Sequence, residues 1–119
     1  MGKQLKILVV DDTELNLRLI SKLVTSEGHI AVTACNGEEA VQKYLSEVPD
    51  LILMDVMMPV MDGYQATLRI RELAGEKWIP VIFLSAKAQD QDQVKGLEVG
   101  GDDYLTKPVN LTLLKAKIK

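Results

Sequence analysis

Residues 6–12 have the sequence KILVVDD, in which a short apolar run ends in two neighbouring aspartates, Asp11 and Asp12. The run at 7–10 has the length of a strand, and every one of its positions is apolar. Continuous apolar strands are buried on both faces, as in a parallel sheet that is covered by helices. The segment therefore predicts a central strand with two carboxylates directly after its carboxyl end.

Four further strand-sized runs follow, and amphipathic segments separate them. The runs lie at 30–34 with some polar alternation, at 51–54, at 81–84 and, more weakly, at 104–106. Strict alternation of short apolar runs with longer amphipathic segments is typical of an α/β domain. The chain is therefore predicted to contain five β/α units in succession.

Helix boundaries are marked by residues that favour caps. Gly28 is expected to end the first helix, and Asp62 is expected to cap the third. Asn36, followed three residues later by Glu39, is expected to open the second helix as a variant capping box. A weak, polar fourth helix is expected around 90–99, and Asn110 is expected to open a fifth. Inward-facing apolar stripes are predicted for the second and third helices, at Ala40, Val41, Tyr44 and Leu45, and at Ala66, Ile70, Leu73 and Ala74.

Composition limits the class of protein. The 119 residues suffice for one compact domain, predicted to span 1–119, and 47% of them are hydrophobic, which argues against disorder. The net charge of −3 makes nucleic acid an unexpected direct partner. The lone Cys35 excludes an internal disulfide, and we see neither a membrane span nor a signal peptide, so a cytoplasmic location is expected. Whether the domain is naturally minimal or cut from a longer protein stays open.

Polar residues follow the predicted strands at the edge where an open parallel sheet binds ligands. They are Asp11, Asp12, Asp55, Ser85 and Lys107 with the adjacent Pro108. Neighbouring carboxylates repel one another, and a divalent cation would remove the conflict. Few carboxylates with room for water favour Mg²⁺ over Ca²⁺, and the lone His29 and Cys35 cannot build a structural zinc site.

Asp55 is a candidate nucleophile toward phosphorus. A carboxylate beside a metal ion can form an aspartyl phosphate, and Lys107, Ser85 and the metal could neutralise the charge on the transferring oxygens. We therefore expect a site for phosphoryl transfer.

Four sequence blocks together resemble the signature of response-regulator receiver domains of two-component signalling, including the chemotaxis regulators. They are KILVVDD at 6–12, DVMMPVMDG at 55–63, LSA at 84–86 and GDDYLTKP at 101–108. The resemblance implies a flavodoxin-like, doubly wound (βα)5 fold with a five-stranded parallel sheet in the order 2-1-3-4-5. It implies a signalling domain rather than an enzyme, one that catalyses only its own phosphorylation and dephosphorylation.

The resemblance also implies roles for individual residues. Asp12 and Asp55 would bind Mg²⁺, with Asp11 assisting directly or through water and Met57 contributing its backbone carbonyl. Asp55 would receive the phosphoryl group from a histidine kinase or phosphotransfer protein, and the changed surface would then bind a downstream effector domain or protein.

The resemblance further assigns the residues that respond to phosphorylation. Ser85 would hydrogen-bond the phosphoryl group and move toward it, Tyr104 would turn inward, and Lys107 would pair with the phosphoryl charge. The bond between Lys107 and Pro108 would be cis, a form whose cost is small only before proline.

Two other functions are consistent with this type of fold. A pseudo-receiver would bind partners without phosphorylation, but such proteins usually lose an acidic residue or the lysine, and here all are present. A phosphatase of the haloacid-dehalogenase kind would place a second acid two residues after Asp55, where this chain has Met57. A stand-alone regulator, a receiver of a hybrid kinase and the input half of a longer regulator stay open.

Overall fold

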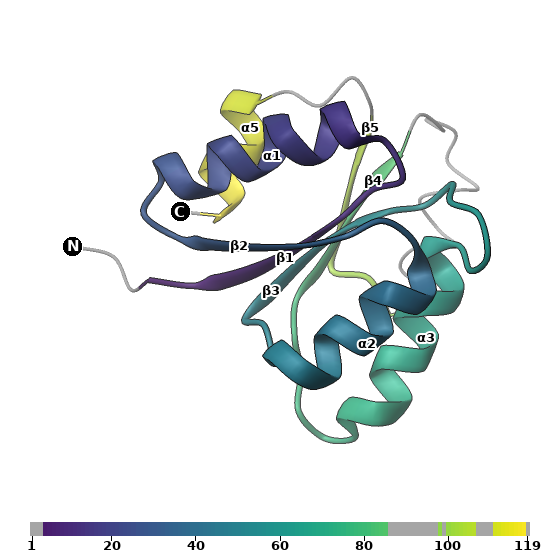
Figure 1. Cartoon of the computed structure of the whole chain (residues 1–119). Coiled ribbons are helices and arrows are strands. Elements are labelled where there is room, and N and C mark those ends of the chain that lie inside the picture. Colours follow the sequence, from purple (N-terminus) through teal and green to yellow (C-terminus); the bar gives the residue numbers. More distant parts are fainter. Residues whose placement is uncertain (1–3, 86–97, 99, 107–110, 119) are drawn as a thin grey trace.

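The computed structural model describes residues 4–85, 98, 100–106 and 111–118, which form one parallel sheet with helices on both faces (Figure 1). The strands are β1 (Lys6–Val10), β2 (Ile30–Ala34), β3 (Leu51–Asp55), β4 (Val81–Ser85) and β5 (Asp103–Thr106). The helices are α1 (Glu14–Ser26), α2 (Gly37–Glu47), α3 (Gly63–Ala74) and α5 (Leu111–Ile118). The predicted fourth helix falls, except for Glu98, outside the described residues.

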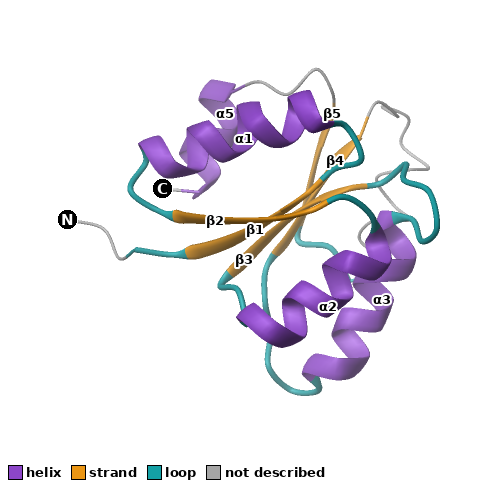
Figure 2. Ribbon diagram, in the orientation of Figure 1, coloured by secondary structure: helices purple, strands orange, loops and turns teal. Residues whose placement is uncertain are grey.

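The sheet order is β2-β1-β3-β4-β5, and every pairing is parallel. Helices α1 and α5 cover one face, and α2 and α3 cover the other (Figure 2). The predicted doubly wound fold and its strand order are therefore confirmed. No helix in the described part of the chain has the length and apolar character needed to cross a bilayer.

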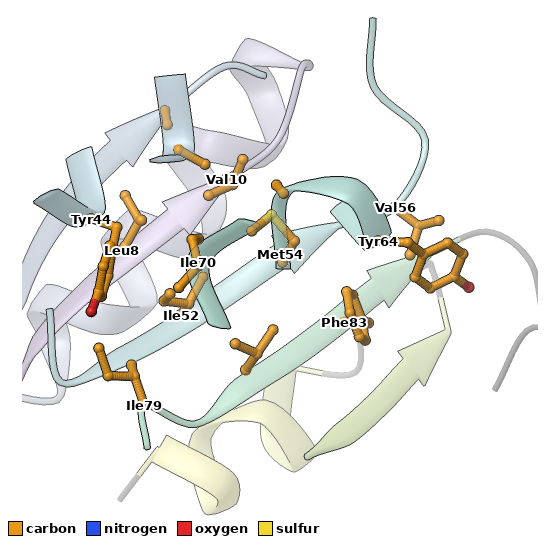
Figure 3. Packing of buried hydrophobic residues seen from close by; sticks show 14 residues of the cluster. Leu8, Val10, Tyr44, Ile52, Met54, Val56, Tyr64, Ile70, Ile79 and Phe83 are labelled. Carbon is orange, nitrogen blue, oxygen red and sulfur yellow. The ribbon is translucent and has the colours of Figure 1, made fainter. Parts of the chain in front are cut away.

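Burial of the strands follows their sequence pattern. Strands β3 and β4 are buried at every position, and β1 is buried from Ile7 to Val10, as continuous apolar runs predict. Side chains alternate between two apolar cores, one on each face of the sheet. Figure 3 shows the core beneath α2 and α3, which includes Leu8, Ile52 and Phe83. Strand β2 lies at the sheet edge and keeps Ile30 exposed.

Two predicted core positions are wrong. Leu45 on α2 is 56% exposed, and Leu73 on α3 is 43% exposed, although their neighbours Tyr44 and Ile70 are buried. Each leucine lies at the margin of its helix's apolar stripe, turned away from the residues at its centre. The two helices pack on the sheet through a narrower face than the sequence pattern indicated.

The structure confirms Asn36 and Asp62 as helix caps, whereas Asn110, expected to open the last helix, lies outside the described residues. The Asn36 side chain accepts a hydrogen bond from the Glu39 backbone N at 2.8 Å. Asp62 caps α3 in the same way, by accepting from the Gln65 backbone N. The Gln65 side-chain oxygen in turn accepts a hydrogen bond from the Asp62 backbone N, which completes a capping box there. Gly28 follows the end of α1 with a φ of 87°, a conformation that favours glycine.

A hydrogen-bonded cluster around Arg71 ties the end of α3 to the beginnings of β4 and β5. The Arg71 guanidinium stacks on the Trp78 ring at 3.5 Å from its centroid and donates to the Gly100 carbonyl and to Asp102. Asp102 also accepts from Trp78 Nε1 and from the Val81 backbone N, each at 2.8 Å. Burial lowers the pKa of Arg71, and the charge of Asp102 opposes that shift. The cluster thus fixes where β5 begins.

We expect Arg71→Lys to lower the free energy of unfolding by about 1–2 kcal/mol, because lysine cannot stack on Trp78 and bond several acceptors at once. Denaturant unfolding followed by circular dichroism measures the change. Arg69→Lys is the matched control, since Arg69 is exposed and lies 3.8 Å from Glu72 in a surface ion pair. That control should stay within about 0.5 kcal/mol of the wild type. Equal effects of the two substitutions would contradict a stabilising role for the cluster.

Candidate functional site

Three carboxylates meet where β1 and β3 end. Asp11, Asp12 and Asp55 each offer one oxygen, and these oxygens all lie within 4.8 Å of one another. Asp11 and Asp55 are 1% and 3% exposed, whereas Asp12 is exposed. The cluster is therefore open to solvent on the side of Asp12, and its other two acids are buried against the sheet.

Backbone geometry holds the acidic residues at this edge. Pairing of β1 with β3 places Val10 beside Met54, so the next residues, Asp11 and Asp55, leave neighbouring strands at the same level. The Asp11 carboxylate accepts a hydrogen bond from the Thr13 backbone N at 2.9 Å, which orients it at the beginning of α1. The site is thus built on strand ends rather than on a long loop.

Gly63 lets the first turn of α3 pack directly on Asp55. A Cβ at Gly63 would lie 2.1 Å from the Asp55 carbonyl oxygen, a distance that no side chain permits. The Gly63 backbone N donates to the Val56 carbonyl at 2.9 Å. This close approach of backbone to backbone fixes the residue that carries the candidate nucleophile.

The loop between β3 and α3 is anchored on α2. The Gly37 backbone N donates to the Met61 carbonyl at 3.0 Å, and a Cβ at Gly37 would clash with that same oxygen. Val60 has a φ of 71°, which costs a β-branched residue about 1–2 kcal/mol. Met57, expected to offer its carbonyl to the metal, lies in this loop with its side chain 56% exposed.

The remaining predicted residues lie on β4, on β5 and beyond them. Ser85 is the last residue of β4 and is fully buried, and its register partner on β5 is Thr106. Tyr104 is half-buried on β5. Lys107 and Pro108, with their expected cis bond, lie outside the described residues.

The chemistry of the donors fits a hard divalent ion. Mg²⁺ binds oxygen at about 2.0–2.1 Å, so ligands on opposite sides of one ion are separated by roughly 4.2 Å. Oxygens within 4.8 Å of one another can therefore share one ion after small movements. Such an ion would neutralise the repulsion among the three carboxylates. Fold and site together define a doubly wound α/β domain with a cluster of three carboxylates at the carboxyl edge of its sheet.

Comparison with known proteins supplies the family. The family model of the response regulator receiver domain matches residues 7–119. The chain is 41% identical over 114 residues to the alkaline phosphatase synthesis transcriptional regulatory protein PhoP of Bacillus subtilis, a match that covers 96% of this chain and 47% of the relative. This chain thus spans about half the length of that relative.

Solved structures agree. One is the receiver domain of the sensor histidine kinase PA1611 from Pseudomonas aeruginosa, which has magnesium coordinated in its active site cleft. It is 34% identical to this chain, with a TM-score of 0.87, and the match covers 98% of this chain and 95% of that one. Another belongs to the CheX-CheY-BeF3-Mg complex of Borrelia burgdorferi, with 31% identity, a TM-score of 0.88 and coverage of 95% and 85%. The chain belongs to the response-regulator receiver domains, the phosphorylation-activated switches of two-component signalling.

Sequence reasoning missed the contacts that support the acidic cluster. Gly63 and Tyr64 follow Asp62 in the sequence, but no role was predicted for either. The available signal was Gly63 itself. A glycine directly after a helix cap is not needed there for a positive φ, so its lack of a side chain indicates that another backbone approaches closely.

We expect Gly63→Ala to weaken Mg²⁺ binding and to lower stability by roughly 1–3 kcal/mol, because the new methyl group must displace the Asp55 backbone. Isothermal titration calorimetry with MgCl₂ and denaturant unfolding measure the two effects. Gly28→Ala is the control: its φ of 87° imposes strain, but nothing lies within 4 Å of its Cβ and it is remote from the acids. It should lose stability and keep its Mg²⁺ affinity. A Gly63→Ala protein that binds Mg²⁺ like the wild type would contradict this role of Gly63.

Proposed function

We propose that this domain accepts a phosphoryl group on Asp55 in a Mg²⁺-dependent reaction, with a phosphohistidine of a histidine kinase or phosphotransfer protein as the donor. The observation that carries the proposal is the meeting of Asp11, Asp12 and Asp55 within 4.8 Å at one sheet edge. Magnesium in the active site cleft of the PA1611 receiver domain supports the choice of metal.

The proposed reaction transfers phosphorus from nitrogen to oxygen. A carboxylate oxygen of Asp55 attacks the phosphorus atom, the bond from phosphorus to the donor's imidazole nitrogen breaks, and that nitrogen keeps the electron pair. Bound Mg²⁺ supplies charge neutralisation on the phosphoryl oxygens. Hydrolysis later returns the free carboxylate and inorganic phosphate. In this step the domain catalyses only its own modification.

Asp12 and Asp55 are the proposed carboxylate ligands of Mg²⁺, and Asp11 would act directly or through water. The Met57 backbone carbonyl would be the remaining protein ligand. The exposure of Asp12 supports this arrangement, because a Mg²⁺ site that keeps several waters needs an open side. The 3% exposure of Asp55 means that a donor must approach from that same side.

Ser85, Tyr104 and Lys107 are the proposed responding groups. Ser85 is buried at the end of β4, next in space to the strand that ends in Asp55, which supports a hydrogen bond from its hydroxyl to the phosphoryl group. Lys107 would pair with the phosphoryl charge and Tyr104 would change position. The altered surface would bind an effector domain of the same polypeptide or a separate protein, and family membership supports a cytoplasmic setting.

Incubation with Mg²⁺ and acetyl phosphate should add one phosphate to the wild-type protein and none to Asp55→Asn, because the amide is not a nucleophile at physiological pH. Phosphate-affinity electrophoresis and intact mass spectrometry measure the product, and EDTA should prevent its formation.

Asp50→Asn is the matched control. Asp50 precedes β3 at the opposite end of the strand from Asp55, and an asparagine oxygen can still accept the bond from the Lys6 backbone N. This variant should be phosphorylated like the wild type. Phosphate on the Asp55→Asn protein, or multiple turnover of a small phosphomonoester by the wild type, would overturn the proposal.

A further inference from the structure

Three aromatic side chains from different elements meet between α3 and the β4–β5 edge of the sheet, on the face that α3 covers. Tyr64 lies in the first turn of α3, Phe83 on β4 and Tyr104 on β5. The Tyr64 and Phe83 rings meet edge to face at 5.2 Å, and the Phe83 and Tyr104 rings lie 6.2 Å apart. Figure 3 shows Tyr64 beside Phe83 at the margin of the core. Phe83 therefore serves as a shared packing surface for the two tyrosines.

The two tyrosine hydroxyls also contact each other. The Tyr64 hydroxyl donates a hydrogen bond to the Tyr104 hydroxyl over 3.4 Å, a long bond that joins residues 40 positions apart. A buried tyrosine hydroxyl usually requires such a partner. Tyr104 thus has both its ring and its hydroxyl engaged by residues that precede it in the chain.

The two partners differ in how firmly they are held. Tyr64 is 6% exposed and sits on a helix whose first turn is fixed by the Asp62 capping box and by the close approach of Gly63 to Asp55. Tyr104 is half-buried on β5, an edge strand of the sheet. When such a pair interacts, the more constrained residue determines the position of the other.

The first turn of α3 therefore contacts both the acidic site and Tyr104. Gly63 packs on the Asp55 backbone, and the next residue, Tyr64, bonds Tyr104. The Thr67 hydroxyl donates to the Gly63 carbonyl at 2.8 Å and braces this turn from inside. A movement of Tyr104 must break or re-form the contact with Tyr64.

We propose that Tyr64 is a positioning residue that holds Tyr104 in the half-buried arrangement of the unmodified domain and so opposes the movement of Tyr104 that accompanies phosphorylation. This inference rests on the proposed function, in which Tyr104 responds to phosphorylation. A contact made in one of two conformations shifts the balance toward that conformation, and by linkage it weakens the binding of every ligand that prefers the other conformation. Loss of the Tyr64 hydroxyl should therefore strengthen the binding of a phosphoryl mimic without changing a residue of the acidic site.

The probe is beryllofluoride with Mg²⁺, and ¹⁹F NMR measures its affinity for the full chain. Tyr64→Phe should bind it two- to fivefold more tightly than the wild type. Tyr104→Phe should show a gain of the same size, and the double variant should gain no more than either single variant, because all three lack the same bond. Tyr44→Phe is the control, since Tyr44 is a buried tyrosine on α2, and it should bind like the wild type.

A second measurement reports on Tyr104 itself. The chain has three tyrosines, so ring-labelled protein gives a small set of assignable NMR signals. The Tyr104 signal should shift in Tyr64→Phe and stay in place in Tyr44→Phe, and thermal unfolding should show that both variants are folded. If Tyr64 had only a structural role, Tyr64→Phe would lower stability, but the beryllofluoride affinities of the single and double variants would not show the non-additive pattern.

The outcomes separate the two proposals. Wild-type or weaker affinity in Tyr64→Phe, or additive gains in the double variant, would overturn the role of Tyr64 and leave the proposed function intact. A wild-type protein that binds no beryllofluoride, or whose Tyr104 signal does not respond when it binds, would overturn the proposed switch and this inference with it.

Discussion

Parallel pairing of β1 with β3 is the constraint on which the site depends. The register places Val10 level with Met54, and the next residue of each strand is an aspartate. Two carboxylates at the same level of adjacent strands lie close together, and Asp12 adds a third. One oxygen of each of the three carboxylates lies within 4.8 Å of the other two. Bringing like charges together costs energy that a bound cation removes. The apolar strands thus supply the stability that keeps this repulsive cluster in place.

Glycines allow the helices to approach that cluster. At Gly63 the beginning of α3 rests on the Asp55 carbonyl, and at Gly37 the beginning of α2 holds the Met61 carbonyl. Both contacts join backbone to backbone, so no side-chain rearrangement can relieve a methyl group placed there. The acids are therefore positioned by the packing of helix ends as much as by the strands that carry them.

Helix α3 connects the two ends of the domain. Its first turn touches Asp55 and Tyr104, and its last turn carries Arg71, which bonds the residues that lead into β5. Strand β5 is thus held by α3 at its beginning, through Asp102, and at Tyr104. Any signal that reaches Tyr104 from the acidic cluster has a physical route through this single helix.

Apolar periodicity and strand-end residues were enough to predict the alternating β/α order, the helix caps and the meeting of Asp11, Asp12 and Asp55, because each reports on burial or on position along one element. The sequence blocks likewise determined the family. Only the tertiary structure decided that Gly63 packs on Asp55, that Tyr64 bonds Tyr104 and that Leu45 stays exposed. These features depend on how closely elements far apart in the chain approach, and a local pattern carries no record of that distance.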